Sequence, residues 1–240
     1  MANPQIVLSR LYSAYMKNER GSDNVLIIID QKDIKIWYCL IFGAVNFPGG
    51  EFIFQLTNPD GYPFAPPSAK ALTPNGLFLI NTKICISIGE FHASDAPKEE
   101  GAYGWRPTIG ADGFAQNIHT AFETFTTDEH GIGIQHSSDT VKRKLAAESS
   151  KYNKENYPAL MKEFESLIET NPELKPVKKI KAARAAFKEL QKSDAPNPSN
   201  DEIVEELEEL EEQIDNVHIN GDEINEEDMR AINEVLNEGN

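Results

Sequence analysis

Residues 73–88 read Thr-Pro-Asn-Gly-Leu-Phe-Leu-Ile-Asn-Thr-Lys-Ile-Cys-Ile-Ser-Ile and contain two turn signals and one cysteine. Asn75-Gly76 and Asn81-Thr82 are turn signals, because asparagine tolerates a positive φ and hydrogen-bonds to its own backbone. The β-branched residues after the second turn predict a short extended segment that contains Cys85. A thiol presented beside a turn suits a nucleophile, whereas a lone cysteine among isoleucines is also typical of a small buried core residue.

Motifs on both sides of Cys85 add to this pattern. Residues 62–67 read Tyr-Pro-Phe-Ala-Pro-Pro, residues 73–75 place an asparagine ten residues before the cysteine, and residues 105–107 read Trp-Arg-Pro. In this order the chain resembles the ubiquitin-conjugating enzymes, with their Tyr-Pro-Phe-x-Pro-Pro, His-Pro-Asn, Ile-Cys-Leu and Trp-x-Pro segments. The resemblance covers about residues 5–165. It implies an α+β fold in which a four-stranded antiparallel meander is joined to an N-terminal helix and C-terminal helices.

One branch of that family, which is tail-anchored in the endoplasmic reticulum membrane, is the most similar. Thr73 stands where most members have histidine, and two more residues separate Asn75 from Cys85. The Phe-His pair at 91–92 and the Lys-Arg-Lys-Leu-Ala-Ala-Glu-Ser segment at 142–149 are similar to the same branch. The chain departs from the family at residues 89–104, an insertion rich in Gly, Pro and acidic residues. A specificity element and a tolerated surface insertion both remain open for it.

Hydrophobic periodicity predicts the same order of elements from the residues alone. We expect helices at 4–18, 109–125, 139–152, 156–168 and 175–192, and strands at 25–29, 34–42, 51–56 and about 68–72. Cys39 lies within the second strand, away from any turn, and is predicted to pack in the core. The expected organisation is a core domain at 1–168, a basic helical extension at 169–192, and a linker with an acidic, mobile tail at 193–240.

The acidity of the chain is concentrated at one end. The net charge is −16, yet residues 201–240 hold 16 acidic residues and one arginine, whereas residues 1–200 hold 23 acids and 22 bases. Such a tail opposes binding to nucleic acid or anionic lipid. No apolar run approaches the ~18 residues of a membrane span, and neither a signal peptide nor the branch's anchor is recognisable. We therefore expect a soluble protein of the cytoplasm or nucleus, without a disulfide framework.

The resemblance implies catalytic roles for several residues around the turn. Cys85 would carry ubiquitin as a thioester, since a thiolate is a strong nucleophile and its thioester stays reactive towards amines. Asn75 would donate its amide to the oxyanion of the tetrahedral intermediate. A purely structural role in the turn is the alternative for Asn75, and Asn81 competes for the donor role because of the changed spacing.

A proton acceptor for the attacking amine is expected near the mouth of the site. Ser137, Ser138 and Asp139 match the place of the gate in the family, and they equally match an N-cap of the following helix. His92 could act as a base or in ligase choice, or be a solvated loop histidine. No His/Cys cluster or phosphate-binding loop is present in the sequence, so we expect neither a metal nor a cofactor.

The implied partners are ubiquitin, its activating enzyme, a RING-type ligase and a protein substrate. Arg10 and Lys17 on the first helix, together with Arg20 after it, are the candidate contacts there, with a solvated polar face as the alternative. Phe64 is a ligase contact in the family or a plug beneath its loop, and the motif residues Trp105 and Pro107 join this candidate surface.

The predicted function is therefore ubiquitin conjugation through Cys85, with lysine as the acceptor and hydroxyl side chains also open. Two alternatives remain: an inactive adaptor of the same fold, against which the presence of Cys85 argues, and a conjugating enzyme for a ubiquitin-like modifier.

Overall fold

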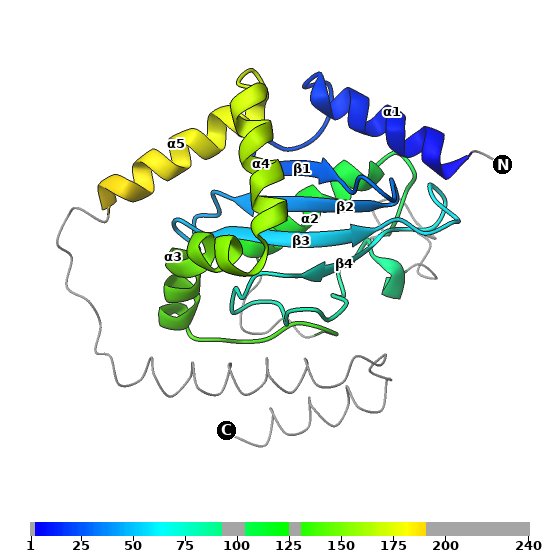
Figure 1. The fold of residues 1–240 in the computed structure, drawn as a ribbon. Helices are drawn as coiled ribbons and strands as arrows, with labels where there is room; N and C mark the ends of the chain where they lie inside the picture. Colours follow the sequence, from blue (N-terminus) through cyan, green and yellow to red (C-terminus); the bar gives the residue numbers. More distant parts are fainter. Residues whose placement is uncertain (1–2, 93–103, 125–130, 191–240) are drawn as a thin grey trace. The chain divides into compact units, whose positions relative to one another are not determined.

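The computed structural model describes residues 3–92, 104–124 and 131–190 (Figure 1), all of which belong to one unit of the chain, Met1–Pro198. The predicted linker and acidic tail at 193–240, and residues 93–103 of the insertion, lie outside the described residues. The elements in chain order are α1 (Pro4–Met16), β1 (Val25–Ile29), β2 (Ile36–Phe42), β3 (Glu51–Thr57), β4 (Ser68–Ala71), η1 (Glu90–His92), α2 (Gly110–Thr124), α3 (Asp139–Asn156), α4 (Pro158–Thr170) and α5 (Lys175–Leu190).

The four strands form one antiparallel sheet in the order β1-β2-β3-β4, which confirms the predicted meander. Cys39 in β2 pairs with Ile27 of β1 on one side and with Phe54 of β3 on the other. The next step of the ladder pairs Phe54 with Ala71 of β4. Together with the helices before and after the sheet, this arrangement confirms the α+β fold that the sequence predicts.

Strand β2 begins at Ile36, two residues later than predicted. The Asp30 carboxylate accepts hydrogen bonds from the N–H groups of Lys32 and Asp33, at 2.8 and 3.0 Å. These bonds, with one from the N–H of Ile36 to the carbonyl of Asp33, keep the β1–β2 connection in a turn.

Both faces of the sheet are buried, which explains why its first three strands are almost continuously apolar. Alternate side chains enter two separate clusters, so that Cys39 lies in one and its neighbour Leu40 in the other. The first cluster includes the apolar side of α2, and the second includes α4 and the start of α5. Figure 1 shows α4 and α2 on opposite sides of the strands. Cys39 is fully buried, as predicted.

Proline sets the boundary between α3 and α4. Pro158 is the first residue of α4, where its fixed φ suits a helix start and its missing N–H costs nothing. It cannot continue α3, which therefore runs to Asn156, four residues beyond the predicted end.

Helix α5, which forms most of the predicted basic extension, packs against the core. Val177 and Ile180 are fully buried in the cluster that α4 shares with the sheet. The side chain of Asn18, after α1, accepts a hydrogen bond from the N–H of Lys175 and donates one to the carbonyl of Glu173. These contacts cap the start of α5. No helix among the described residues has the length and apolar character needed to cross a membrane.

Candidate active site

The turn at Thr73–Phe78 is built around the side chain of Asn75, which is fully buried. Its Oδ1 accepts hydrogen bonds from the N–H groups of Leu77 and Phe78, at 2.9 and 2.7 Å. Its Nδ2 donates to the carbonyl oxygens of Thr73 and Phe78, at 2.9 and 3.2 Å. Both hydrogens of the amide are thus engaged within the turn, and the structural role weighed for Asn75 accounts for all of its contacts.

The turn requires glycine at position 76 for two reasons. The backbone has a positive φ of +74° there, and neighbouring side chains leave no room for a side chain. A Cβ atom there would lie 3.0 Å from Cγ of Lys142 and 3.1 Å from Cβ of Ser137. The start of α3 therefore packs directly onto the turn, which only a glycine permits.

Cys85 is presented by the period-two alternation of an extended segment. Ile84, Ile86 and Ile88 are buried, whereas Cys85 is half-buried and Ser87 is exposed. Because alternate side chains of an extended chain point to opposite sides, the isoleucines anchor the segment and the thiol faces away from the core.

The two cysteines differ sharply in environment. Burial raises the pKa of the Cys85 thiol, and a hydrogen bond with the backbone of Ile132 works in the opposite direction, lowering that pKa. Burial raises the pKa of the Cys39 thiol well above its usual range, and the nearby Asp112 carboxylate raises it further. Cys39 is thus an inert core residue, and Cys85 is the cysteine that a reagent or protein partner can reach.

The loop before α3 forms one wall beside Cys85. The N–H of Cys85 donates to the carbonyl of Ile132 at 2.8 Å, and Phe78 forms an isolated antiparallel bridge with Ile134. Gly133 has φ +75°, and a Cβ atom there would lie 2.7 Å from the carbonyl oxygen of Lys83. Ile132 and Gly133 were not predicted as neighbours of the cysteine. The Gly-Ile-Gly segment at 131–133 was the available signal.

The predicted gate residues lie at the other end of this loop. The N–H of Ser137 donates to the carbonyl of Gly76, so that Ser138 and Asp139 begin α3 beside the Asn75 turn. The Ser138 hydroxyl accepts from the N–H of Val141 at 3.3 Å and caps α3, which is the alternative weighed for it. Asp139 is exposed, and one of its carboxylate oxygens lies 3.8 Å from Nζ of Lys142. A role of either residue in proton transfer stays a prediction.

Two further candidates lie next to the cysteine segment. His92 is the last residue of η1, and its side chain lies outside the described part of the structure. Asn81 is half-buried with φ 58°, and its N–H donates to the carbonyl of Ala71 at 2.8 Å. Its side-chain amide makes no hydrogen bond to another described residue, in contrast to that of Asn75.

Phe64, Trp105 and Pro107 come from two segments that a hydrogen bond joins. The side chain of Phe64 is 71% exposed, so the alternative of a core plug is wrong. Trp105 donates from Nε1 to the carbonyl of Pro63 at 2.8 Å and thereby ties its own segment to the Phe64 loop. Pro107, two residues further on, is exposed.

The basic residues of the first helix region divide into two kinds. Arg10 and Lys17 are exposed on and just after α1. Arg20 instead donates from Nε to the buried Asp112 carboxylate at 3.0 Å and from an Nη to the carbonyl of Ile109 at 2.9 Å. Arg20 therefore holds the first turn of α2 to the segment after α1, so its guanidinium is already engaged. Within the described ranges, no group of three or more His, Cys, Asp or Glu side chains is placed to hold a metal ion.

Comparison with known proteins gives a consistent set of relatives. No family model matches the chain. Ubiquitin-conjugating enzyme E2 6 of Eremothecium gossypii is 32% identical over 167 residues, which are 68% of this chain and 63% of that protein. The protein of the same name from Schizosaccharomyces pombe is 29% identical over 199 residues, 80% of each chain. Ubiquitin-conjugating enzyme E2 J2-like of Dictyostelium discoideum is 30% identical over 152 residues, 62% of this chain and 81% of that protein.

The chain matches only part of some relatives. The matched region spans 63% of the Eremothecium gossypii protein and 54% of ubiquitin-conjugating enzyme E2 6 of Debaryomyces hansenii. Among solved structures, human ubiquitin-conjugating enzyme E2 G1 aligns with a TM-score of 0.37 and 25% sequence identity, covering 49% of this chain and 93% of that one.

Proposed function

Since the chain belongs to the ubiquitin-conjugating enzyme family, we propose that it accepts ubiquitin as a thioester on Cys85 and transfers it to an amino group of a protein substrate. The observation that carries this proposal is the contrast between the two cysteines. Cys85 is half-buried beside the loop at 131–134, to which its N–H is hydrogen-bonded, whereas Cys39 is fully buried.

Loading of Cys85 is a thiol exchange. Sγ of Cys85, after losing its proton, attacks the carbonyl carbon of the thioester that links the C-terminus of ubiquitin to the activating enzyme. A tetrahedral intermediate forms and collapses, the carbon–sulfur bond to the activating enzyme breaks, and that enzyme's thiolate leaves. Burial raises the pKa of the Cys85 thiol, so the thiol must first lose its proton before it can attack. The free-energy cost of this deprotonation increases as the pH falls.

Discharge transfers the acyl group to an amine. The neutral substrate amine attacks the thioester carbon and an oxyanion develops. The bond to Sγ then breaks, Cys85 leaves as a thiolate, and the nitrogen gives its proton to solvent to form the amide. Both amide hydrogens of Asn75 are engaged in its own turn. We therefore assign Asn75 to holding the turn, and Asn81, whose side chain makes no hydrogen bond to another described residue, to donating to the oxyanion.

The partners of the reaction follow from the same proposal. Arg10 on α1 and Lys17 just after it, both exposed, are assigned to contacts with the activating enzyme and the ligase. Phe64 and Pro107 are assigned to the ligase, with Trp105 fixing the loop that carries Phe64. The exposure of Phe64, an unusual position for a large aromatic side chain, supports this assignment.

A two-stage reaction tests the proposed function. The protein is first incubated with activating enzyme, ubiquitin and ATP, and the loaded form is purified under non-reducing conditions. Free lysine is then added, and the loss of the adduct is followed against time. The proposal expects lysine-dependent release of ubiquitin. An adduct that forms and then resists lysine would contradict the transfer step.

A further inference from the structure

A fully buried polar network joins the Asn75 turn to α3. Thr73 and Asn153 are both 0% exposed. The Thr73 hydroxyl accepts a hydrogen bond from the N–H of Ile53 in β3 at 2.9 Å and donates to Oδ1 of Asn153 at 2.5 Å. Since a buried polar atom that loses its partner is strongly disfavoured, this junction of turn, strand and helix has one satisfied arrangement.

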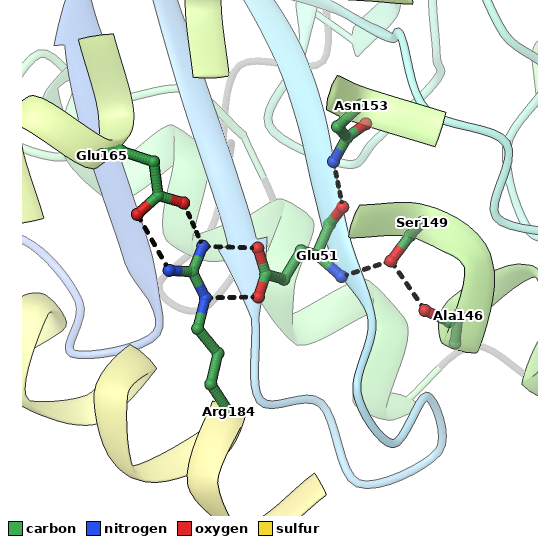
Figure 2. Close-up of polar contacts among 6 residues, drawn as sticks. All are labelled: Glu51, Ala146, Ser149, Asn153, Glu165 and Arg184. Atoms are coloured by element: carbon green, nitrogen blue, oxygen red, sulfur yellow. Dashed lines mark hydrogen bonds and ion pairs between the residues drawn. The ribbon is translucent and has the colours of Figure 1, made fainter. Parts of the chain in front are cut away.

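Asn153 is itself held in place by the first residue of β3. Its Nδ2 donates to the carbonyl of Glu51 at 2.7 Å, and the N–H of Glu51 donates to the Ser149 hydroxyl, one turn earlier in α3, at 2.9 Å. Figure 2 shows both bonds, together with Arg184 of α5, whose guanidinium lies between the carboxylates of Glu51 and Glu165. The backbone of Glu51 thus fixes the orientation of the Asn153 amide.

On its other side the network continues to the cysteine. The carbonyl of Thr73 accepts from Nδ2 of Asn75. The residues that Asn75 organises then pair with the loop before α3, since the N–H of Gln135 donates to the carbonyl of Leu77 at 2.9 Å. In the same loop, the carbonyl of Ile132 accepts a hydrogen bond from the N–H of Cys85. A displacement of the turn therefore changes the wall that stands beside the thiol.

We propose that Asn153, acting through the hydroxyl of Thr73, is a positioning residue that holds the Asn75 turn in the geometry needed for transfer from Cys85. The effect on transfer rests on the proposed function. Neither side chain touches the thiol, and their contribution is to remove the alternative positions of the turn before the substrate arrives.

The test compares four variants with the wild-type protein. Thr73→Val keeps the shape of the side chain and removes its hydroxyl, Asn153→Leu removes the amide, and Thr73→Ser keeps the hydroxyl. Tyr15→Phe is the matched control, because it removes buried hydrogen bonds with the backbone of Val25 and Ile27, which lie outside this network. Thr73→Val decides the question even where Asn153→Leu does not fold.

The first readout is the rate constant for discharge of purified thioester to free lysine, measured well below each variant's Tm. We expect Thr73→Val and Asn153→Leu to slow discharge about tenfold or more, since small displacements of reacting groups are costly. Thr73→Ser and Tyr15→Phe are expected to discharge at the wild-type rate, although Tyr15→Phe lowers the Tm. Slowing in Tyr15→Phe equal to that in Thr73→Val would overturn the proposal, because lost stability would then explain both.

The second readout needs no ubiquitin. The amide hydrogens of Leu77 and Phe78, which donate to Asn75, are expected to exchange faster in Thr73→Val than in wild type or Tyr15→Phe. Equal exchange in all three proteins would overturn the positioning of the turn. If the wild-type protein forms no thioester, the proposed function fails, whereas the exchange rates still decide whether Asn153 and Thr73 hold the turn.

Discussion

Cys85 and Ile132 are joined by a backbone hydrogen bond of 2.8 Å, from the N–H of the cysteine to the carbonyl of the isoleucine. This bond places the extended cysteine segment against the loop that precedes α3. The loop can approach so closely because Gly133 adopts a positive φ next to the carbonyl of Lys83. The thiol is therefore framed on one side by a segment that the chain reaches only after α2.

The first prediction concerns the reactivity of the two thiols. Because burial raises the pKa of Cys85, its thiolate fraction at neutral pH is small and grows about tenfold for each pH unit below that pKa. The rate of Cys85 alkylation by iodoacetamide should rise accordingly between about pH 7 and pH 9. Cys39 should react only in denaturant. Mass spectrometry of the labelled peptides measures both sites, and labelling of Cys39 before Cys85 in the native protein would refute the assignment.

The second prediction separates Asn75 from Asn81. Asn75→Ala leaves the buried N–H groups of Leu77 and Phe78 without an acceptor, which should lower the free energy of unfolding by about 1–3 kcal/mol. Asn81→Gly removes the amide and suits the positive φ of that position, so stability should change little. Discharge to lysine should nevertheless slow about a hundredfold, as when an oxyanion donor is lost. A wild-type discharge rate in Asn81→Gly would return the donor role to Asn75.

Most of the fold could be predicted from the sequence because its signals are local. The apolar strands and the Asn-Gly turn each act within a few residues, and the sheet and most helices appear close to their expected bounds. The surroundings of Cys85 were harder to predict. The approach of Ile132 depends on a long-range bridge between Phe78 and Ile134, which no local pattern specifies.

Polar contacts between distant segments were the other unpredicted feature. Arg184 appeared in the sequence as one base in a basic helix, and Arg20 as an exposed candidate contact. The structure pairs them with Glu51 and Asp112, respectively. Such pairs depend on how helices pack on the sheet, and net charge along the chain carries no information about them.

The third prediction concerns the ion pair that fastens α5. The Arg184 guanidinium contacts both oxygens of Glu51, at 2.7 and 2.9 Å, and the Glu51 side chain is only 7% exposed. Arg184→Met leaves this carboxylate buried without its counter-charge and should lower the free energy of unfolding by about 2 kcal/mol, after allowance for partial exposure of the arginine.

Urea denaturation measures this change. Lys178→Met is the matched control on the same helix, because its pair with Glu173 is exposed on both sides and should contribute little. Glu51→Gln should lower the free energy of unfolding less in the Arg184→Met background than in wild type, since the two partners act together. Equal effects of Arg184→Met and Lys178→Met would contradict the importance of the Glu51 pair.

The fourth prediction is a pH dependence of stability. His119 in α2 is 6% exposed, and burial lowers the pKa of its ring below the ordinary 6.5, with Glu123 acting in the opposite direction and Lys179 in the same direction. As the pH falls through 6.5, the unfolded chain binds a proton that the folded one does not, so His119 contributes a loss of stability. The loss levels off below the folded-state pKa.

Unfolding curves at a series of pH values between about 5 and 7.5 measure this contribution. His119→Gln should remove it, so that the decline with falling pH becomes shallower than in wild type. An unchanged slope in His119→Gln would show that the residue titrates alike in the two states.

A thioester assay on single-cysteine variants decides whether Cys85 accepts ubiquitin. Wild type, Cys85→Ala and Cys39→Ala are each incubated with activating enzyme, ubiquitin and ATP, and resolved by electrophoresis with and without reductant. Wild type and Cys39→Ala should form a reductant-sensitive adduct, and Cys85→Ala should form none. An adduct that persists in Cys85→Ala, or its absence from the wild type, would contradict the proposed role of Cys85.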